Sequence, residues 1–542
     1  MRAPIGGMVV APQPLAVAAG ARVLMGGGNA VDAAVTTAFV QMVVDPQMCG
    51  VAGFGTAHVW QAETGASTVV DFQGRAGSKA TPEMWRDLIE EEYWNGYGYR
   101  LQGFVNDVGY GSITTPGTVA GLAETLRQFG TIGWDQAIRP AVPLARDGFL
   151  VSRELYRLWT TPPIPGRPDN ALRTAANEAA RRLYRKDDGS FYYPGQRFRN
   201  PDFAITLERL ASAGPEDFYT GELGQRMAAD LEQHGSFVTA DDLKGYTARV
   251  LKPHRSTYRG YTVDSPAEPN GGLTVLQMLN ILENYDLKGM GLNTTEYVYT
   301  VARAMQAATF DRVTQVGDPE FVPVPAYRLL GKEHAQIWRR RIDSGSPIHI
   351  PRYAPEAPHT TNVTVRDRQG NLAIITHSLG SAAGVVCDGL GFMYNNLMNC
   401  FDPQPGRVNS IVPGKARVTG MCPTIVFDAD GRPVLALGAP GGTRIMTGVL
   451  QTILNVLDHG LTAVEAVSAP RFDSQSEHLD AEARIPEWVL APLAERGFKL
   501  FPNPSALSMF ALVQAIVLDH AKGEMQGGSD PRGGGCVLTD QR

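Results

Sequence analysis

Two adjacent threonines, Thr360 and Thr361, are the residues with the clearest capacity for covalent chemistry. They follow Pro358-His359 and open a segment, TTNVTV, in which polar and apolar residues alternate as in a β-strand. A turn, DRQG, and an apolar strand, LAIIT, complete a predicted hairpin up to residue 378. Threonine is a common strand residue, so this spacing alone fits a structural pair as well as a nucleophile.

A second candidate is the glycine-rich stretch GAPGGTR at 438–444. It follows a predicted strand and opens a predicted helix, so its backbone N–H groups would converge at a helix N-terminus. Such a cluster of donors suits an oxyanion. The other glycine-rich stretches, at 26–34, 50–55 and 269–274, lack the spacing of phosphate-binding loops, and tight turns account for them.

Other catalytic constellations are missing from the sequence. It has no GxSxG elbow and no HExxH pair, and its histidines show no metal-ligand spacing. The five cysteines are odd in number and include no CxxC pair, which argues against a zinc site or a disulfide framework. We therefore expect no metal and no other cofactor.

Composition excludes several classes of partner. The formal net charge is −6 and no block of Lys and Arg occurs, so we expect binding neither to nucleic acid nor to a membrane. The most apolar run, 31–44, is too short to span a bilayer and contains Asp32, and we interpret it as a buried helix. Pro12, Pro14 and Arg22 interrupt the apolar N-terminus, so we expect no signal peptide and a cytoplasmic location.

The pattern of elements changes along the chain. Up to residue 350 the sequence is mostly helical, with an early pair of strands. The predicted strands are 53–60 and 67–73, and the predicted helices are 134–149, 152–159, 170–185, 273–285 and 295–312. Residues 344–359 contain four prolines and one glycine and read as an exposed linker.

Hairpins dominate the part after this linker. Three are predicted, at 362–378, 423–440 and 508–530, with helices at 442–460 and 462–470. Antiparallel hairpins mixed with helices predict an α+β fold in which helical layers cover sheets, and a four-layer αββα sandwich fits this pattern.

Blocks along almost the whole chain resemble the γ-glutamyltransferase family of N-terminal-nucleophile hydrolases, in the right order. These blocks are GGNAVDAAVTTAFVQMVVDP (27–46), TTPGTVAGL (114–122), RPAVPLARDGF (139–149), PNGGLTVLQMLNILE (269–283), Asp311-Arg312, TTNVTVRDRQGNLA (360–373), MCPTIVFDADGRPVLALGAPGGTRI (421–445), APRF (469–472) and SDPR (529–532). The resemblance implies a precursor that cuts itself before a threonine. The cut would fall between His359 and Thr360, giving a large subunit, 1–359, and a small subunit, 360–542.

The resemblance also assigns catalytic roles. Thr360 would be the nucleophile, and its new α-amine would serve as its own base. Thr361 would orient Thr360, and Ser378 would hydrogen-bond to it. Gly441 and Gly442 would donate backbone N–H groups to the oxyanion. The reaction would be acyl transfer from an amide to Thr360 and then to water or an amine.

The expected substrate clamp departs from the family pattern on its carboxylate side. Typical members hold the glutamyl α-carboxylate with an arginine in a block resembling DFRExAP. This chain has DFQGRAG, with Gln73 at that place and Arg75 two residues on. A Ser-Ser pair that completes the carboxylate site is Thr419-Gly420 here.

The amine side departs as well. Typical members hold the α-amine with an aspartate after Asn-Asn-x-Met, and here NNLMNCF places Cys400 there, with Asn399 before it. Gly380 replaces a family asparagine. A neutral set lacks the charge-assisted contacts that a zwitterionic glutamyl group needs.

Four functional hypotheses follow. The first is an autoprocessing amide hydrolase of this family with a non-standard small-molecule substrate. The others are an ordinary γ-glutamyltransferase or glutathione hydrolase, an amidohydrolase of oxamate or cephalosporin type, and a scaffold that never matures. The sequence leaves open the acyl group, the acceptor and whether two processed heterodimers associate.

Overall fold

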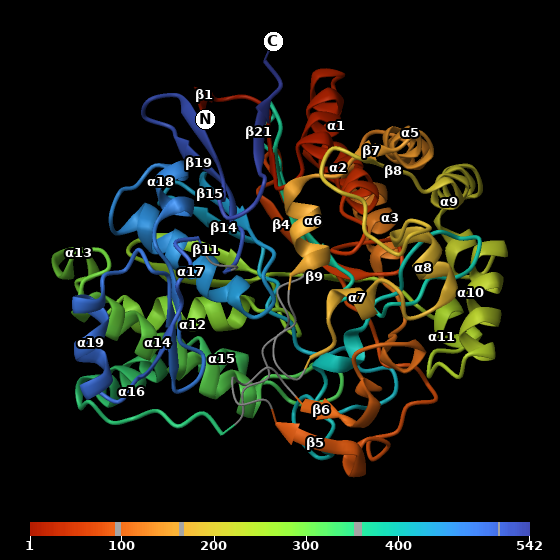
Figure 1. Cartoon of the computed structure of the whole chain (residues 1–542). Helices are drawn as coiled ribbons and strands as arrows, with labels where there is room; N and C mark the ends of the chain where they lie inside the picture. The colour runs from red at the N-terminus through yellow and green to blue at the C-terminus, as the bar shows by residue number, and fades with distance from the viewer. Residues whose placement is uncertain (93–98, 162–166, 352–359, 508–509, 542) are drawn as a thin grey trace.

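Two seven-stranded antiparallel sheets carry the site in the computed structural model, which describes residues 1–92, 99–161, 167–351, 360–507 and 510–541 (Figure 1). The first sheet has the order β21 (Cys536–Thr539), β2 (Met8–Ala11), β12 (Thr361–Arg366), β13 (Leu372–Ser378), β3 (Phe54–Gln61), β4 (Ala66–Phe72), β9 (Arg249–Leu251). The second has the order β1 (Arg2–Pro4), β20 (Glu524–Ser529), β19 (Gln514–Asp519), β15 (Pro433–Gly438), β14 (Thr424–Phe427), β11 (Tyr261–Ser265), β10 (His254–Tyr258). The hairpin β12–β13 therefore lies at the centre of the first sheet.

The two sheets pack face to face, and helices cover their outer faces. Strands β12 and β13 lie against β15 and β19 of the second sheet. The helices on the first sheet are α1 (Pro14–Met25), α2 (Ala30–Val44) and α3 (Thr118–Phe129); those on the second are α12 (Gly272–Leu282), α17 (Arg444–Leu457) and α18 (Ala463–Ser468). Every residue of β12 and β13 is buried because both of their faces are covered. The structure is the predicted four-layer αββα sandwich.

Further elements surround this sandwich. Helices α14 (Thr295–Gln315) and α16 (Lys332–Asp343) pack on α12. The remaining α-helices are α4 (Trp134–Ile138), α5 (Val142–Arg146), α6 (Arg153–Thr160), α7 (Asn170–Arg173), α8 (Glu178–Tyr184), α9 (Pro201–Ala213), α10 (Glu222–Gln233), α11 (Ala240–Lys244), α13 (Leu287–Met290), α15 (Ala326–Leu329) and α19 (Glu487–Glu495). The small sheets are β5 (Ile89–Glu92) with β6 (Tyr99–Leu101), β7 (Phe149–Leu150) with β8 (Arg197–Phe198), and β16 (Phe472–Asp473), β17 (His478–Ala481), β18 (Lys499–Pro502).

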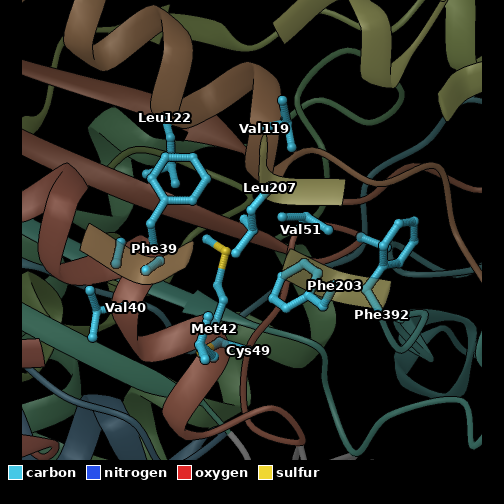
Figure 2. Close-up of a cluster of buried hydrophobic side chains, with 14 of the residues drawn as sticks. Phe39, Val40, Met42, Cys49, Val51, Val119, Leu122, Phe203, Leu207 and Phe392 are labelled. Atoms are coloured by element: carbon cyan, nitrogen blue, oxygen red, sulfur yellow. The ribbon is translucent and has the colours of Figure 1, made fainter. Parts of the chain in front are cut away.

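Helix α2 is buried along its whole length and ends beside the site. Asn29 begins it with a capping box: its side chain accepts hydrogen bonds from the backbone N–H groups of Val31 and Asp32. Figure 2 shows Phe39 and Met42 of this helix among apolar side chains from α3 and α9. Shortening Phe39 to alanine would cost about 3–5 kcal/mol of stability by opening a cavity in such a core. This packing fixes the position of the last turn of α2.

Most of the predicted elements are confirmed. Both early strands, all three hairpins, the buried helix at 31–44 and the helices near 152–159, 273–285, 295–312, 442–460 and 462–470 are present. Two predicted helices are each broken into shorter pieces. Pro140 and Pro143 divide 134–149 because proline cannot donate within a helix, and Asn177 caps a second short helix within 170–185.

Two other interpretations need correction. The large-subunit part was expected to have strands only near its start, yet β9, β10 and β11 lie between residues 249 and 265. The described part of the linker, 344–351, is neither helix nor strand, but it is not exposed throughout. Ile348 and Ile350 are buried in the core that α14 and α16 share with the second sheet. The remainder of the linker, 352–359, lies outside the described residues.

Candidate active site

Thr360 lies directly before β12, in the buried space at the mouth of the hairpin. It is 3% exposed, and its Oγ1 donates a hydrogen bond to Ser378 Oγ at 3.3 Å. Ser378 ends β13, and the antiparallel register that pairs Thr361 with His377 brings the two strand ends together. Ser378 Oγ also accepts the N–H of Gly380 at 2.9 Å. The central hairpin therefore fixes the hydroxyl that the resemblance assigns as nucleophile.

Thr361 faces the helical layer. Its Oγ1 accepts hydrogen bonds from Gln13 Nε2 and Gln41 Nε2, both at 3.1 Å. Gln41 Nε2 also donates to the carbonyl of Asn362, and its Oε1 lies 2.9 Å from His377 Nε2. Burial lowers the pKa of His377 to about 3, so its ring is neutral. This network holds the first residues of β12, next to Thr360.

The Gly441-Gly442 turn lies between β15 and α17. Both glycines have positive φ, +141° and +61°, and a side chain on Gly441 would collide with the backbone of Ala511 at 2.7 Å. Strand β15 ends at Gly438, where an added Cβ would meet Asn362 Nδ2 at 2.4 Å. The turn therefore follows a strand end that lies in direct contact with β12, the strand that begins one residue after Thr360.

A cavity of about 780 Å³ opens onto Thr360. Its lining is mostly apolar and comes from the end of α2, from β7 and α6, and from the Pro440 and Leu512 loops. Asp45, the C-terminal cap of α2, contributes a carboxyl group, and Ser381 a hydroxyl. The arginines of the described wall all have partners. Arg173 pairs with Asp107 at 2.8 Å and Arg444 with Asp480 at 2.6 Å, and Arg167 lies 4.0 Å from Asp107. Arg157 and Arg197 donate to the carbonyls of Arg532 and Gly148.

Gln73, which stands at the place of the expected arginine, is buried and does not line this cavity. Its Nε2 donates to the carbonyl of Gly55 at 3.1 Å and to Asn270 Oδ1 at 3.2 Å. The guanidinium of Arg75 points elsewhere: it donates to the carbonyl of Thr247 and lies 5.0 Å from the centre of the Tyr246 ring. Arg75 therefore does not take the position of the missing arginine in this structure.

The residues expected to face the α-amine of a glutamyl group form hydrogen bonds with each other and with Asp107. Cys400 Sγ lies 2.8 Å from Asn399 Oδ1, and Asn399 Nδ2 donates to Asp107 Oδ1 at 2.9 Å. Burial raises the pKa of Asp107, but the cations of Arg173 and Arg167 and the hydrogen bond from Asn399 together outweigh burial and hold that pKa below its ordinary value. Gly380 has φ +72°, and a side chain there would meet Asn396 Oδ1 at 2.4 Å. Asparagine tolerates this left-handed backbone, but an asparagine at position 380 would require Asn396 to move.

Thr419 and Gly420 lie against the glycine turn. Thr419 Oγ1 accepts the N–H of Met421 at 3.2 Å, and a Cβ on Gly420 would meet the carbonyl of Gly442 at 2.4 Å. A serine at 420 would therefore push the turn away. Among the described residues, the cavity wall contains none of the seven residues expected in the clamp: Gln73, Arg75, Gly380, Asn399, Cys400, Thr419 and Gly420.

Sequence reasoning missed several residues of this site. Gln13, Gln41 and Asp45 surround the start of β12, and Gln41 could have been noticed as the lone amide within the apolar run 38–44. Arg417 was also missed. It is 1% exposed, its guanidinium lies 5.2 Å from the centre of the Phe54 ring, and its Nη1 donates to the carbonyl of Val418. Arg417 contacts Phe54, and Gln73 donates to the carbonyl of the next residue, Gly55. Both therefore lie at the end of β3 that pairs with Ser378.

Comparison with known proteins identifies the family. A family model described as Gamma-glutamyltranspeptidase matches residues 16–539. This chain belongs to the gamma-glutamyltranspeptidase family. The acylase ACY 1 proenzyme of Pseudomonas sp. strain V22 is 37% identical over 503 residues, 92% of this chain and 88% of that protein. The glutathione hydrolase proenzyme of Escherichia coli K12 is 33% identical over 560 aligned positions, 97% of this chain and 90% of that protein.

Solved structures of the family agree with the fold. Cephalosporin acylase from Bacillus halodurans has a TM-score of 0.85 at 27% identity, covering 99% of this chain and 96% of that chain. The γ-glutamyltranspeptidase of Helicobacter pylori has a TM-score of 0.56 at 31% identity, covering 61% and 90%. The α+β architecture is thus that of N-terminal-nucleophile hydrolases, and the chain is a hydrolase of the gamma-glutamyltranspeptidase family.

The described residues contain neither a membrane-spanning helix nor a cluster of metal ligands. In the ranges given above, no helix is long and apolar enough to cross a bilayer. Within those same ranges, no group of three or more His, Cys, Asp and Glu side chains is arranged to hold a metal ion.

Proposed function

We propose that this protein is an autoprocessing threonine hydrolase that cleaves amides carrying an acyl group other than γ-glutamyl. Self-cleavage between His359 and Thr360 would give a large subunit, 1–359, and a small subunit, 360–542. The hydrogen bond from Thr360 Oγ1 to Ser378 Oγ supports this assignment. So does the Gly441-Gly442 turn, because it follows β15, whose last residue, Gly438, lies against Asn362 of β12. Both relatives described above carry the word proenzyme in their names.

The proposed turnover uses the new N-terminus. The α-amine of Thr360 accepts the proton of Oγ1, and the oxygen attacks the amide carbonyl of the substrate. The N–H groups of Gly441 and Gly442 stabilise the oxyanion, and the departing amine takes the proton from the α-ammonium group. Water then attacks the ester on Thr360 and releases the acid. An amine acceptor in place of water would give transfer.

The single observation that carries the substrate claim is the environment of Gln73. It is a neutral amide already bonded to Gly55 and Asn270, and the acid expected at position 400 is a cysteine. A zwitterionic glutamyl group would lose its two charge-assisted contacts, each worth about 1.5–3 kcal/mol. The largely apolar cavity beside Thr360 supports an apolar group on one side of the scissile bond.

One observation favours a more specific candidate, an acyl group with a terminal carboxylate and no amine. Arg417 supplies a buried cation at the corner that Gln73 shares, while no acid stands at position 400. Such a group resembles γ-glutamyl without its α-amine. The names of two relatives, an acylase and a cephalosporin acylase, agree with an acyl compound as substrate.

Two chromogenic amides test this proposal. Glutaryl-p-nitroanilide and γ-glutamyl-p-nitroanilide differ only in the α-amine. We expect hydrolysis of the glutaryl compound to be faster by about tenfold or more, since one charge-assisted contact is absent. Arg417→Gln should reduce this preference, whereas Thr360→Ala should abolish turnover of both. Preferred hydrolysis of the γ-glutamyl compound would instead identify an ordinary glutathione hydrolase.

A further inference from the structure

Asp45 is a carboxyl group at the wall of the Thr360 cavity to which neither the fold nor the proposed reaction assigns a role. It caps the C-terminus of α2, where the helix dipole disfavours negative charge. Its side chain is partly accessible, and it lines the cavity. Among the described residues, its side chain has one hydrogen bond, from Gln13 Nε2 to Oδ2 at 2.7 Å.

The Gln13 amide connects Asp45 to the nucleophile strand. Its Nε2 donates to Asp45 Oδ2 and to Thr361 Oγ1, and its Oε1 accepts from Gln41 Nε2 at 2.7 Å. An amide that faces a carboxylate must present its NH₂ group to it, because a carboxylate only accepts hydrogen bonds. Gln13 Oε1 also accepts from Thr361 Oγ1 at 3.2 Å, so both ends of the amide contact this hydroxyl. The charge on Asp45 therefore fixes the orientation of the amide, with its NH₂ group toward Asp45.

We propose that Asp45 is a positioning residue for self-cleavage and turnover: it orients the Gln13 amide, which with Gln41 holds the hydroxyl of Thr361 and the start of β12. This inference rests on the proposed function, because it assumes cleavage before Thr360. It adds a residue outside the β12–β13 hairpin, in the wall of a cavity whose described lining includes none of the clamp positions.

The ionisation of Asp45 gives this role a measurable signature. Burial raises the pKa of Asp45 to about 7, and the hydrogen bond from Gln13 offsets part of that rise. The other titratable groups packed around it are Cys49 and Tyr184, whose pKa values burial also raises. Charged groups face the same cavity from α6, α7, β8, α17 and the segment before α7: Glu154, Arg157, Arg167, Arg173, Arg197 and Arg444.

Self-cleavage is the cleanest readout. Before cleavage Thr360 has no free α-amine, so the pH profile of the precursor does not contain the titration of that amine. We expect the cleavage rate of the wild-type precursor, purified and shifted between pH 5 and 9, to rise through pH 7 as Asp45 ionises. Asp45→Asn keeps an acceptor oxygen but cannot ionise. Its cleavage at pH 8 should be slower by about 10- to 100-fold, because a small misplacement of the reacting atoms has an effect of this size. Its pH profile should also lack the rise near pH 7.

Three further variants make the test decisive. Gln13→Ala should show the same loss, and the double variant with Asp45→Asn should be no slower than either single variant, since both break one connection. Asp45→Glu should recover part of the rate and the step. Asp230→Asn is the matched control, because Asp230 is a partly exposed carboxyl whose pKa burial also raises, bonded to Tyr110 far from this network.

The outcomes separate the two proposals. A wild-type chain that never cleaves contradicts the proposed function. Normal cleavage with an unchanged pH profile in Asp45→Asn, or additive losses in the double variant, contradicts the role of Asp45 alone. Circular dichroism of each precursor excludes unfolding, and if Asp45→Asn fails to fold, the pH profile of Gln13→Ala decides.

Discussion

The two sides of the nucleophile strand differ in what their polar groups contact. On the α2 side, Gln13 and Gln41 bond to Thr361 and so to the start of β12. On the clamp side, Gln73 bonds to Gly55 and Asn270, and Cys400 to Asn399, which leaves the expected positions without a charge pair for a glutamyl group. The groups that hold the start of β12 are thus separate from those expected to bind the acyl group, and one set can change while the other is kept.

The largest effect is expected at the Gly441-Gly442 turn, because the proposed reaction needs its oxyanion donors whichever side is altered. Gly441→Ala would push a methyl group into the backbone of Ala511 and displace the proposed oxyanion donors. We expect a loss of about 10²–10³-fold in kcat, equivalent to roughly 3–4 kcal/mol. Gly431→Ala is the control: Gly431 also has a positive φ, +75°, but in a turn with open space around it. It should lower stability by about 1 kcal/mol without affecting kcat. Equal kcat values for the two variants would remove the turn from the mechanism.

A second large effect concerns stability on the α2 side. The pKa of Asp45 is raised to about 7, so the folded chain keeps a proton that the unfolded chain releases from about pH 4 upward. The contribution of Asp45 to stability is therefore fully present below pH 4 and is lost as the pH rises through 7. Relative to wild type, Asp45→Asn should gain on the order of 3 kcal/mol between pH 4 and pH 8.

Urea denaturation of the two proteins at both pH values measures this difference. A constant difference across that range would mean that Asp45 is ionised in the folded protein at acidic pH. A gain in stability together with slower cleavage would show that the carboxylate is kept for function at a cost to the fold.

A moderate effect is expected on the clamp side. Gln73→Arg with Cys400→Asp should raise γ-glutamyl-p-nitroanilide hydrolysis by about tenfold, because it restores a cation for the carboxylate and an anion for the amine. Cys400→Asp alone should narrow the preference for the glutaryl compound. Unchanged specificity in both variants would mean that the acyl site differs from the family pattern at more than these two residues.

The smallest effect is expected from Ser378→Ala. The hydroxyl of Ser378 accepts from Thr360 Oγ1 and from the N–H of Gly380, and its loss removes about 1 kcal/mol of hydrogen bonding. We expect kcat to fall by roughly fivefold and the pH step assigned to Asp45 to remain. Complete inactivity would show that Ser378 moves a proton rather than positioning Thr360.

The sequence was most informative where structure is local. Turn signals and alternation located the hairpin β12–β13, and the unbroken apolar run located α2. Short polar strands such as β10, HRSTY, gave no such signal because the strand alternates between partly buried and exposed residues at a sheet edge. The division of the helix predicted at 134–149 could have been predicted from its prolines alone, because proline cannot donate a backbone hydrogen bond within a helix.

The sequence revealed only part of the candidate site. The resemblance assigned roles to Thr360 and the glycine turn, and these stay predictions. It did not reveal the network around Thr361, which joins residues 13, 41 and 361 and which only the folded layers bring together. Substitutions at Gly380 and Gly420 looked like lost contacts in the sequence. In the structure they are places where a larger side chain would collide with Asn396 or with the carbonyl of Gly442.

The central claim is that Thr360 becomes an N-terminal nucleophile, and intact mass under denaturing conditions tests it most directly. We expect purified wild-type protein to give two fragments that divide between His359 and Thr360, and Thr360→Ala to remain one chain of 58.5 kDa, less the oxygen and CH₂ lost by the substitution. Two fragments in both proteins would contradict a self-cleavage that depends on Thr360. A single intact chain in a folded, active wild-type protein would contradict the N-terminal nucleophile itself.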